Sequence, residues 1–377
     1  MTELGRHAAT AAPGPSRRRL TAAAMAALFV VGVVLNAGLL RRAGGALTEL
    51  SPAALAVLGA VAVLYRLLQT ALLASSLQRI SWRRALLASE AYAGCSNSLV
   101  GGGAVGTGVK TAMLRSWGVE NSAIATSITV TAIVPAVAMW LMALLHTAPE
   151  VAAGTASTNQ VVLAGASVVA LAGHGAFWCL LLQRHGLARR LAGGANAVAR
   201  RARPLCRGPL RRLQRPLARF DAQDLAERMR ADARALARGR AARLVAVGLA
   251  SQVCLALLLT VTLWGLGAHQ AGWFEVFQAF AVARVAASFV PLPGGIGVLD
   301  VGLFTGLVHV GAPAPVVMAA LVVYRASTFA LPIATGSTAL LWWRRVHRRR
   351  TGAPHRVREL RPTAPAEQPV AARRAVA

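Results

Sequence analysis

Long runs of apolar residues, separated by short polar stretches, dominate the chain from residue 20 to residue 343. A helix that crosses a membrane needs about 20 mostly apolar residues, and several of these runs reach that length. The pattern therefore predicts an all-α, polytopic membrane protein. The expected segments are Leu20–Leu40, Pro52–Ser75, Ala85–Val119, Ile124–Leu145, Val161–Leu182, Leu244–Leu266, Trp273–Val290, Asp300–Val310 and Pro315–Trp343.

Composition supports a membrane protein and excludes several other classes. Hydrophobic residues make up 56% of the 377 residues, charged residues only 14%, and the mean hydropathy is +0.53. The net charge of +28 comes from arginines that flank or separate the apolar runs, so we expect a membrane and no nucleic acid as partner. The cysteines contain no CxxC pair, so we expect no disulfide framework, no metal site and no cofactor. They are Cys95, Cys179, Cys206 and Cys254.

The distribution of arginine predicts the orientation. The loop from Arg184 to Arg243 is dense in arginine, whereas the loop from His146 to Gln160 has no lysine or arginine. Cytoplasmic loops carry the excess of basic residues, which places both termini in the cytoplasm and gives about eight crossings. We expect a basic cytoplasmic tail (1–19), a transmembrane domain (20–343) and a disordered cytoplasmic tail (344–377). Arg41 and Arg42 fall on the outer side and disagree with this orientation.

The arginine-rich loop (184–243) contains a predicted amphipathic helix. Asp221 stands in the position of a helix N-cap, and Leu225, Met229 and Leu236 recur at near-helical spacing. This segment is expected near the inner membrane face. It is either a solvated positive loop or a sensor of anionic lipids.

Two expected helices are interrupted by glycine and proline. The first interruption lies in "SLVGGGAVGTGVKTAMLRSWGV" from Ser98, and the second in "SFVPLPGGIGVLDVGLFTGLVHVG" from Ser288. Broken backbone at membrane depth must be surrounded by protein or line a polar cavity, because each unpaired backbone group costs several kcal/mol in hydrocarbon. Breaks at corresponding places in two halves are typical of transporters built from repeats. The alternative is that the glycines only allow helices to pack closely.

Ionisable residues inside the apolar runs mark candidate functional positions. Basic side chains outnumber acidic ones there by five to three, which leaves positive charge for a phosphate. Asp300 either pairs with Arg284 or Arg325, or only stabilises the first turn of its helix. His174 is assigned no role. The charged residues are Arg66, Glu90, Lys110 and Arg115 in the first half and Glu275, Arg284, Asp300 and Arg325 in the second.

The second interruption and the span after it resemble a known family. "PLPGGIGVLDVGL" and "VVMAALVVYRASTFALPIATGSTALLWWRR" resemble the signature of the lysylphosphatidylglycerol synthase transmembrane-region family, also called flippase-like. "GGGAVGTGVKTAMLRSWGV" resembles the family's first glycine motif, and the resemblance extends from about Leu20 to Trp343. Two features depart from the family. Asp300 replaces the usual glutamate, and "TSITVTAIVPA" lacks a common basic-acidic pair.

The resemblance implies a lipid translocase of a bacterial plasma membrane. Its substrate would be an anionic or amphoteric phospholipid, or a polyprenyl-phosphate-linked lipid. The family's best-studied relatives also carry a soluble aminoacyl-transfer domain, which we do not find, so we expect no enzyme activity. A lipid-linked glycosyl- or aminoacyl-transferase component and a non-transporting assembly partner of the cell envelope remain alternatives. The expected substrate site consists of Gly102, Gly103, Gly106, Lys110, Arg115, Arg284, Pro293, Gly294, Gly295, Gly297, Asp300, Tyr324 and Arg325.

Overall fold

The computed structural model describes residues 45–77, 79–98, 102–183, 222–288 and 297–352, and these residues form helices and connections without a β-strand. The predicted all-α class is therefore confirmed. The helices are α3 (Pro52–Ser76), α4 (Trp82–Ser98), α5 (Gly102–Ser116), α6 (Asn121–Ala152), α7 (Thr158–Gln183), α10 (Ala222–Gly265), α11 (Trp273–Ser288), α12 (Val298–His309), α13 (Ala314–Arg325), the π-helix η4 (Ala326–Ala330) and α14 (Leu331–Gly352).

Several sequence-based expectations lie outside the described residues. These are the basic tail, the first span, most of the arginine-rich loop, three residues of the expected site and the end of the C-terminal tail. In residue numbers they are 1–19, Leu20–Leu40, 184–221, Pro293, Gly294, Gly295 and 353–377.

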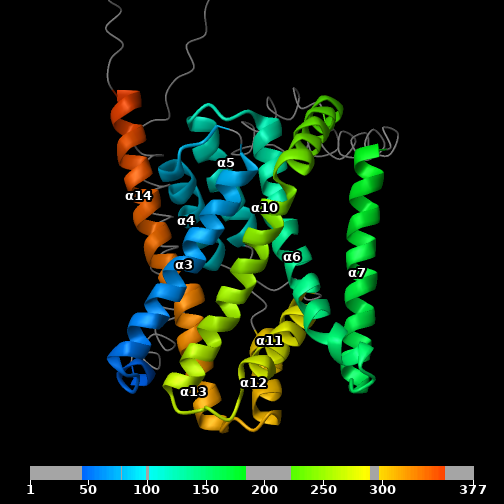
Figure 1. Ribbon diagram of the computed structural model, residues 1–377. Helices are drawn as coiled ribbons and strands as arrows, with labels where there is room; N and C mark the ends of the chain where they lie inside the picture. Colours follow the sequence, from blue (N-terminus) through cyan, green and yellow to red (C-terminus); the bar gives the residue numbers. More distant parts are fainter. Residues whose placement is uncertain (1–44, 78, 99–101, 184–221, 289–296, 353–377) are drawn as a thin grey trace, which may run out of the picture.

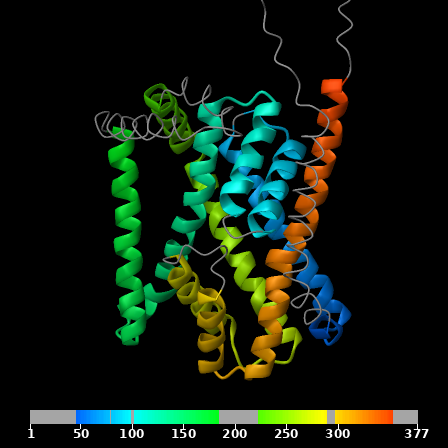
Figure 2. The same cartoon turned by 180° about the vertical axis from the view of Figure 1, so that it is seen from behind.

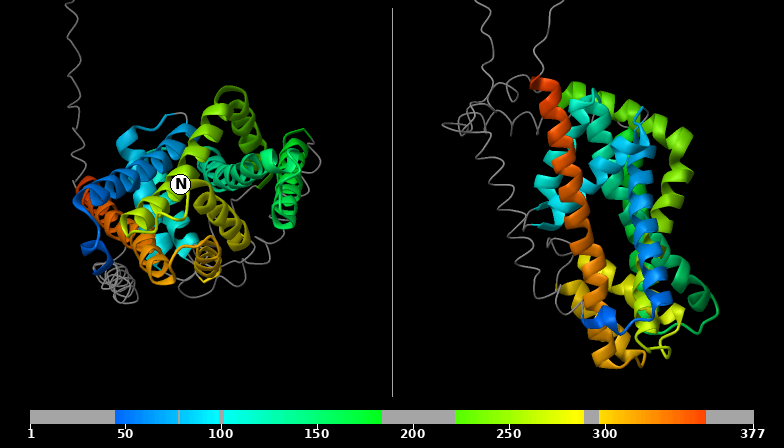
Figure 3. Two further views of the ribbon diagram at one scale, coloured as in Figure 1. Left: turned by 60° about the horizontal axis from the view of Figure 1, so that its bottom comes forward. Right: turned by 90° about the vertical axis from the view of Figure 1, so that its left-hand side faces the viewer.

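Four helices are long and apolar enough to cross a membrane: α3, α6, α10 and the continuous run from α13 through η4 into α14. Helix α7 extends over a similar height at the edge of the bundle, where it packs mainly on α6 (Figure 3). The described residues do not establish the expected count of about eight crossings. The amphipathic segment after Asp221 is helical, but it is continuous with the next span, because both belong to the 44-residue helix α10.

The two interrupted segments fold as helical hairpins. Helices α4 and α5 pack against each other, as do α11 and α12. These helices contain 17, 15, 16 and 12 residues. Each is shorter than the roughly 20 residues that a crossing requires. The chain therefore turns back at both glycine-containing breaks, and each hairpin begins and ends at the same end of the molecule (Figures 1 and 2).

The two hairpins enter the helical bundle from opposite ends. One end of the molecule contains the end of α3, the start of α10 and the end of α14, and we call it the arginine-rich end. The α4–α5 hairpin lies in that half, and the α11–α12 hairpin lies in the other (Figure 2). Each half thus consists of a span, a hairpin and a second span. In the first half these are α3, the α4–α5 hairpin and α6. In the second half they are α10, the α11–α12 hairpin and the run α13–η4–α14. The two halves run in opposite directions, which makes them inverted repeats.

The last span contains a local change of helix type with an identifiable cause. Between α13 and α14 the backbone forms the π-helix η4, in which the Leu331 N–H bonds the Ala326 carbonyl. Pro332 follows directly and has no N–H, so the carbonyl of Thr328, four residues earlier, lacks its α-helical donor. Asn97 Nδ2, near the end of α4, donates to this carbonyl at 3.0 Å. The break in the last span is therefore bonded to the turn of the first hairpin.

Helices α4 and α14 approach each other backbone to backbone. A Cβ atom on Gly94 would lie 2.9 Å from the Gly336 Cα, and one on Gly336 would lie 2.3 Å from the Glu90 carbonyl oxygen. Glycine is thus needed at both positions for this contact, as is common where membrane helices pack closely. The contact fixes the first hairpin against the last span.

We expect Gly94→Leu to destabilise the protein and Gly59→Leu to leave its stability unchanged or slightly raised. Both changes replace a helical glycine and gain up to about 1 kcal/mol of helix propensity. Only position 94 lacks space, because a Cβ at Gly59 would meet nothing within 4 Å. Thermal unfolding in detergent measures the difference. Equal unfolding temperatures for the two variants would contradict the close α4–α14 contact.

Candidate functional site

The described part of the expected site divides between the two hairpins and the last span. Gly102, Gly103, Gly106, Lys110 and Arg115 lie on α5. Arg284 lies on α11, Gly297 and Asp300 lie at the start of α12, and Tyr324 and Arg325 end α13. The structure brings the members from the second half together, whereas Arg115 lies at the arginine-rich end, away from them.

Asp300, which is half-buried, and Arg325, which is buried, form an ion pair that joins α12 to α13. Arg325 Nε and Nη2 donate to the two carboxylate oxygens at 2.6 and 2.8 Å, and the Arg325 side chain is 9% exposed. Asp300 Oδ2 also accepts from the Gly297 N–H at 3.0 Å. The predicted pairing with Arg325 is therefore confirmed, and Asp300 caps its own helix as well. Gly297 has a φ of 87°, which favours glycine at this turn.

Arg284 lies close to this pair but has no carboxylate partner. Its Nε atom is buried and makes no hydrogen bond, and its guanidinium carbon lies 5.9 Å from the centre of the Phe280 ring. Tyr324, which is 2% exposed, is within electrostatic reach of both Arg284 and Arg325. The guanidinium of Arg284 thus has capacity for an additional acceptor.

A second buried ion pair lies in the first half. Arg66 Nε on α3 donates to Glu90 Oε1 on α4 at 2.9 Å, and the two side chains are 12% and 9% exposed. Thr335 on α14 donates to the other oxygen of Glu90. The sequence marked Arg66 and Glu90 as charged residues at depth, but they were not included in the expected site. Thr335 was missed, because a threonine in an apolar run carries no distinguishing signal.

This second ion pair lines a groove on the surface of the bundle. The groove has a volume of about 690 Å³ and lies between α3, α4 and α14. Leucine, valine and tryptophan side chains make most of its wall, and Arg345 lies at the arginine-rich end. The groove therefore combines an apolar wall with charged groups, as an amphipathic ligand would require.

Lys110 is the buried cation of the first hairpin. It is 4% exposed, and its Nζ donates to the Thr131 hydroxyl on α6 at 3.2 Å. The ammonium also lies 4.8 Å from the centre of the Tyr92 ring on α4, at a distance typical of a cation–π contact. No carboxylate is among its partners.

The glycines of α5 differ in their surroundings. A Cβ on Gly102 would lie 2.5 Å from the Ser96 carbonyl oxygen, and one on Gly106 would lie 2.6 Å from that of Tyr92. Close packing on α4 accounts for glycine at these two positions. Gly103 has more room, with the Ser96 hydroxyl 3.8 Å away.

The positive and negative charges inside the apolar part of the molecule do not balance. Glu90 and Asp300 are each engaged by an arginine, and Lys110 and Arg284 have no carboxylate partner in the part of the chain that the structure describes. The acids outside that part lie in polar segments rather than apolar runs: Glu3, Asp221, Glu359 and Glu367. Each hairpin therefore contributes one basic side chain without an acidic partner, and each of the two is a surplus cation whenever it is protonated. Across the described residues, no three His, Cys, Asp or Glu side chains are grouped to hold a metal ion.

Inverted halves, each with a broken hairpin and a basic side chain that has no acidic partner, define a polytopic membrane protein built from inverted repeats. The family model of the lysylphosphatidylglycerol synthase transmembrane region matches residues 19–336, and the chain belongs to this family. None of the curated proteins matches the chain.

We expect Arg325→Gln to destabilise the protein more than Arg325→Gln combined with Asp300→Asn. Removing one partner of a buried pair costs about 3–5 kcal/mol, because the other charge is left uncompensated. Asparagine at position 300 still offers an oxygen to the Gly297 N–H, so the double variant removes both charges and keeps the cap. Unfolding in detergent provides the comparison. A double variant less stable than Arg325→Gln would show that the pair is not the stabilising unit.

Proposed function

We propose that this protein moves an anionic lipid, either a phospholipid or a polyprenyl-phosphate-linked lipid, between the two leaflets of a membrane. The observation that carries the proposal is the pair of surplus cations, Lys110 and Arg284, with one on each hairpin. A charged group without a partner is costly in a low-dielectric interior. A lipid phosphate would supply the missing negative charge.

The architecture supports movement of that head group through the molecule. In transporters with inverted repeats, the substrate binds between the repeats near mid-depth, and the two sides open in turn. Arg284 lies about 16 Å along α11 from its first residue, at the rise of 1.5 Å per residue, and is close to the break of its hairpin. The apolar groove between α3, α4 and α14 favours a lipid over a soluble anion, because it offers a path for acyl or prenyl chains.

The family match also bears on the choice between transport and catalysis. It covers the transmembrane region of the family, over residues 19–336 of the chain. We therefore propose a translocase that is not itself an enzyme. A protein that only supports an assembly of the cell envelope would have no need of surplus cations, and the transport assay below distinguishes it.

We expect Arg284→Gln to slow lipid movement at least tenfold without destabilising the protein. A hydrogen bond to a charged group contributes about 1.5–3 kcal/mol, and the loss of Arg284 leaves no buried carboxylate unpaired. The assay follows fluorescent phosphatidylglycerol and, separately, a fluorescent polyprenyl phosphate in reconstituted vesicles, with phosphatidylcholine as the neutral comparison.

Arg238→Gln is the control for that experiment, because Arg238 is an exposed arginine on α10. Faster movement of only one anionic probe by the unmodified protein identifies the lipid class. Movement of neither probe, or an unchanged rate in Arg284→Gln, contradicts the proposed function.

We further propose that the arginine-rich end faces the cytoplasm, with both termini on that side. Single cysteines at Gly154 and Arg238, in variants that lack the native cysteines, test this orientation. The Gly154 connection lies at the opposite end and is exposed, as is Arg238. In intact cells a membrane-impermeant thiol reagent should label position 154 and spare position 238. The reverse pattern would invert the orientation.

A further inference from the structure

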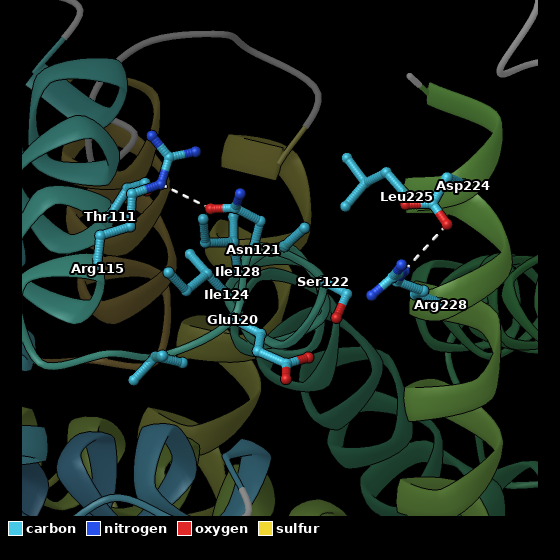
Figure 4. A pocket seen from close by; sticks show the side chains of 12 residues that line it. Thr111, Arg115, Glu120, Asn121, Ser122, Ile124, Ile128, Asp224, Leu225 and Arg228 are labelled. Carbon is cyan, nitrogen blue, oxygen red and sulfur yellow. Dashed lines mark hydrogen bonds and ion pairs between the residues drawn. The ribbon is translucent and has the colours of Figure 1, made fainter. Parts of the chain in front are cut away.

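A polar pocket opens at the arginine-rich end, above the buried lysine. It has a volume of about 680 Å³ and lies between the α5–α6 connection and the first turns of α10 (Figure 4). Arg115 on one wall donates to Asn121 at 2.8 Å, and Arg228 on the facing wall bonds Asp224 at 3.0 Å. Glu120 lies between the two walls in Figure 4. The pocket is therefore lined by both positive and negative groups.

The pocket extends toward Lys110. Its lining includes Thr111 on α5 and Ile128 on α6. Thr111 is the neighbour of Lys110 in the chain, and Ile128 lies one helical turn from Thr131, the hydrogen-bond partner of Lys110. Lys110 itself does not line the pocket, but residues next to it and next to its partner Thr131 do.

The amine has only neutral groups around it. Tyr92 faces it from α4 and Thr131 from α6. The charged groups of the helices around α5 have other partners: Glu90 binds Arg66, Arg84 lies over the Trp117 ring, and Arg115 binds Asn121. Arg344 and Arg345 belong to α14, which contacts α5 through an apolar cluster that includes Leu340 and Val109 and through a hydrogen bond from Trp343 Nε1 to the Ser116 hydroxyl.

The choice of lysine at this position is informative. The chain contains 41 lysines and arginines together, and Lys110 is the only lysine among them. An arginine stays protonated under all ordinary conditions, whereas a buried lysine can release and regain its proton. Apart from the histidines, Lys110 is therefore the one residue of the chain whose basic side chain can exchange a proton in this setting.

We propose that Lys110 is a proton-coupling site, which takes up one proton from the pocket when an anionic head group binds and carries it with the lipid. This inference rests on the proposed function. Water supplies the proton, the neutral amine becomes an ammonium, and the ammonium and the phosphate together have no net charge. A neutral complex crosses a low-dielectric interior at far lower cost than an isolated phosphate. A proton gradient would then drive the lipid toward the alkaline side.

The first experiment measures proton uptake without requiring transport. Short-chain phosphatidylglycerol is added to the purified full-length protein in weakly buffered detergent, and the pH change is recorded. Its phosphodiester stays ionised, so any uptake belongs to the protein. We expect up to one proton per protein for the unmodified chain and almost none for Lys110→Met or Lys110→Arg. Arg238→Lys, the reverse exchange at an exposed site, should behave as the unmodified protein.

The second experiment applies a pH gradient across reconstituted vesicles. We expect the gradient to accelerate phosphatidylglycerol movement toward the alkaline side in the unmodified protein and in Arg238→Lys, and to have no effect in folded Lys110→Arg. Uptake that persists in both Lys110 variants overturns the proposal, as does transport by Lys110→Arg that still follows the gradient. If proton uptake depends on Lys110 but no lipid moves, the proton site stands and the translocase function is refuted.

Discussion

Every polar group at membrane depth needs a partner, and this requirement explains most of the architecture. In hydrocarbon an unbonded backbone group costs several kcal/mol. The chain nevertheless breaks two helices with glycine and inserts Pro332 into a third. The break in the last span is tolerated because the Thr328 carbonyl that Pro332 leaves free accepts from Asn97. The same requirement places Arg66 against Glu90 and Arg325 against Asp300, so that each pair joins two consecutive helices.

The surplus cations, Lys110 and Arg284, depart from this rule because they have no acidic partner among the described residues. Lys110 and Arg284 each lie beside an aromatic ring, which partly offsets the cost of a buried positive charge. They differ in chemistry, because only the lysine can lose its charge. A protein that keeps such groups in its interior must gain something from them. In the functions proposed above, an anionic ligand at Arg284 and exchange of a proton at Lys110 would account for both.

Much of the fold could be predicted from the sequence, because apolar runs and glycine breaks are local signals. The sequence also offered a pair of Asp300 with Arg284 or Arg325, but it could not choose between the two arginines or exclude that Asp300 only stabilises its own helix. The contact between Asn97 and Thr328 could not, because it depends on how a hairpin packs against a span more than 200 residues later. Nor could the sequence show that the expected segment Ala85–Val119 is a hairpin, because a glycine break does not reveal whether the chain continues across the membrane or turns back. The packing role of Gly106 likewise depends on the position of Tyr92.

The π-helix of the last span sets the angular relation between the two hairpins. Arg325, immediately before η4, holds the second hairpin, and Gly336, a few residues after it, holds the first. A π-helical turn holds one more residue than an α-helical one, and each residue of an α-helix rotates the chain by about 100°. Deleting one residue from η4 would therefore rotate Gly336 about the helix axis by roughly 100° relative to Arg325. The two hairpins could then no longer both face the last span, so the length of η4 is fixed by geometry even though its sequence, ASTFA, is unremarkable in composition.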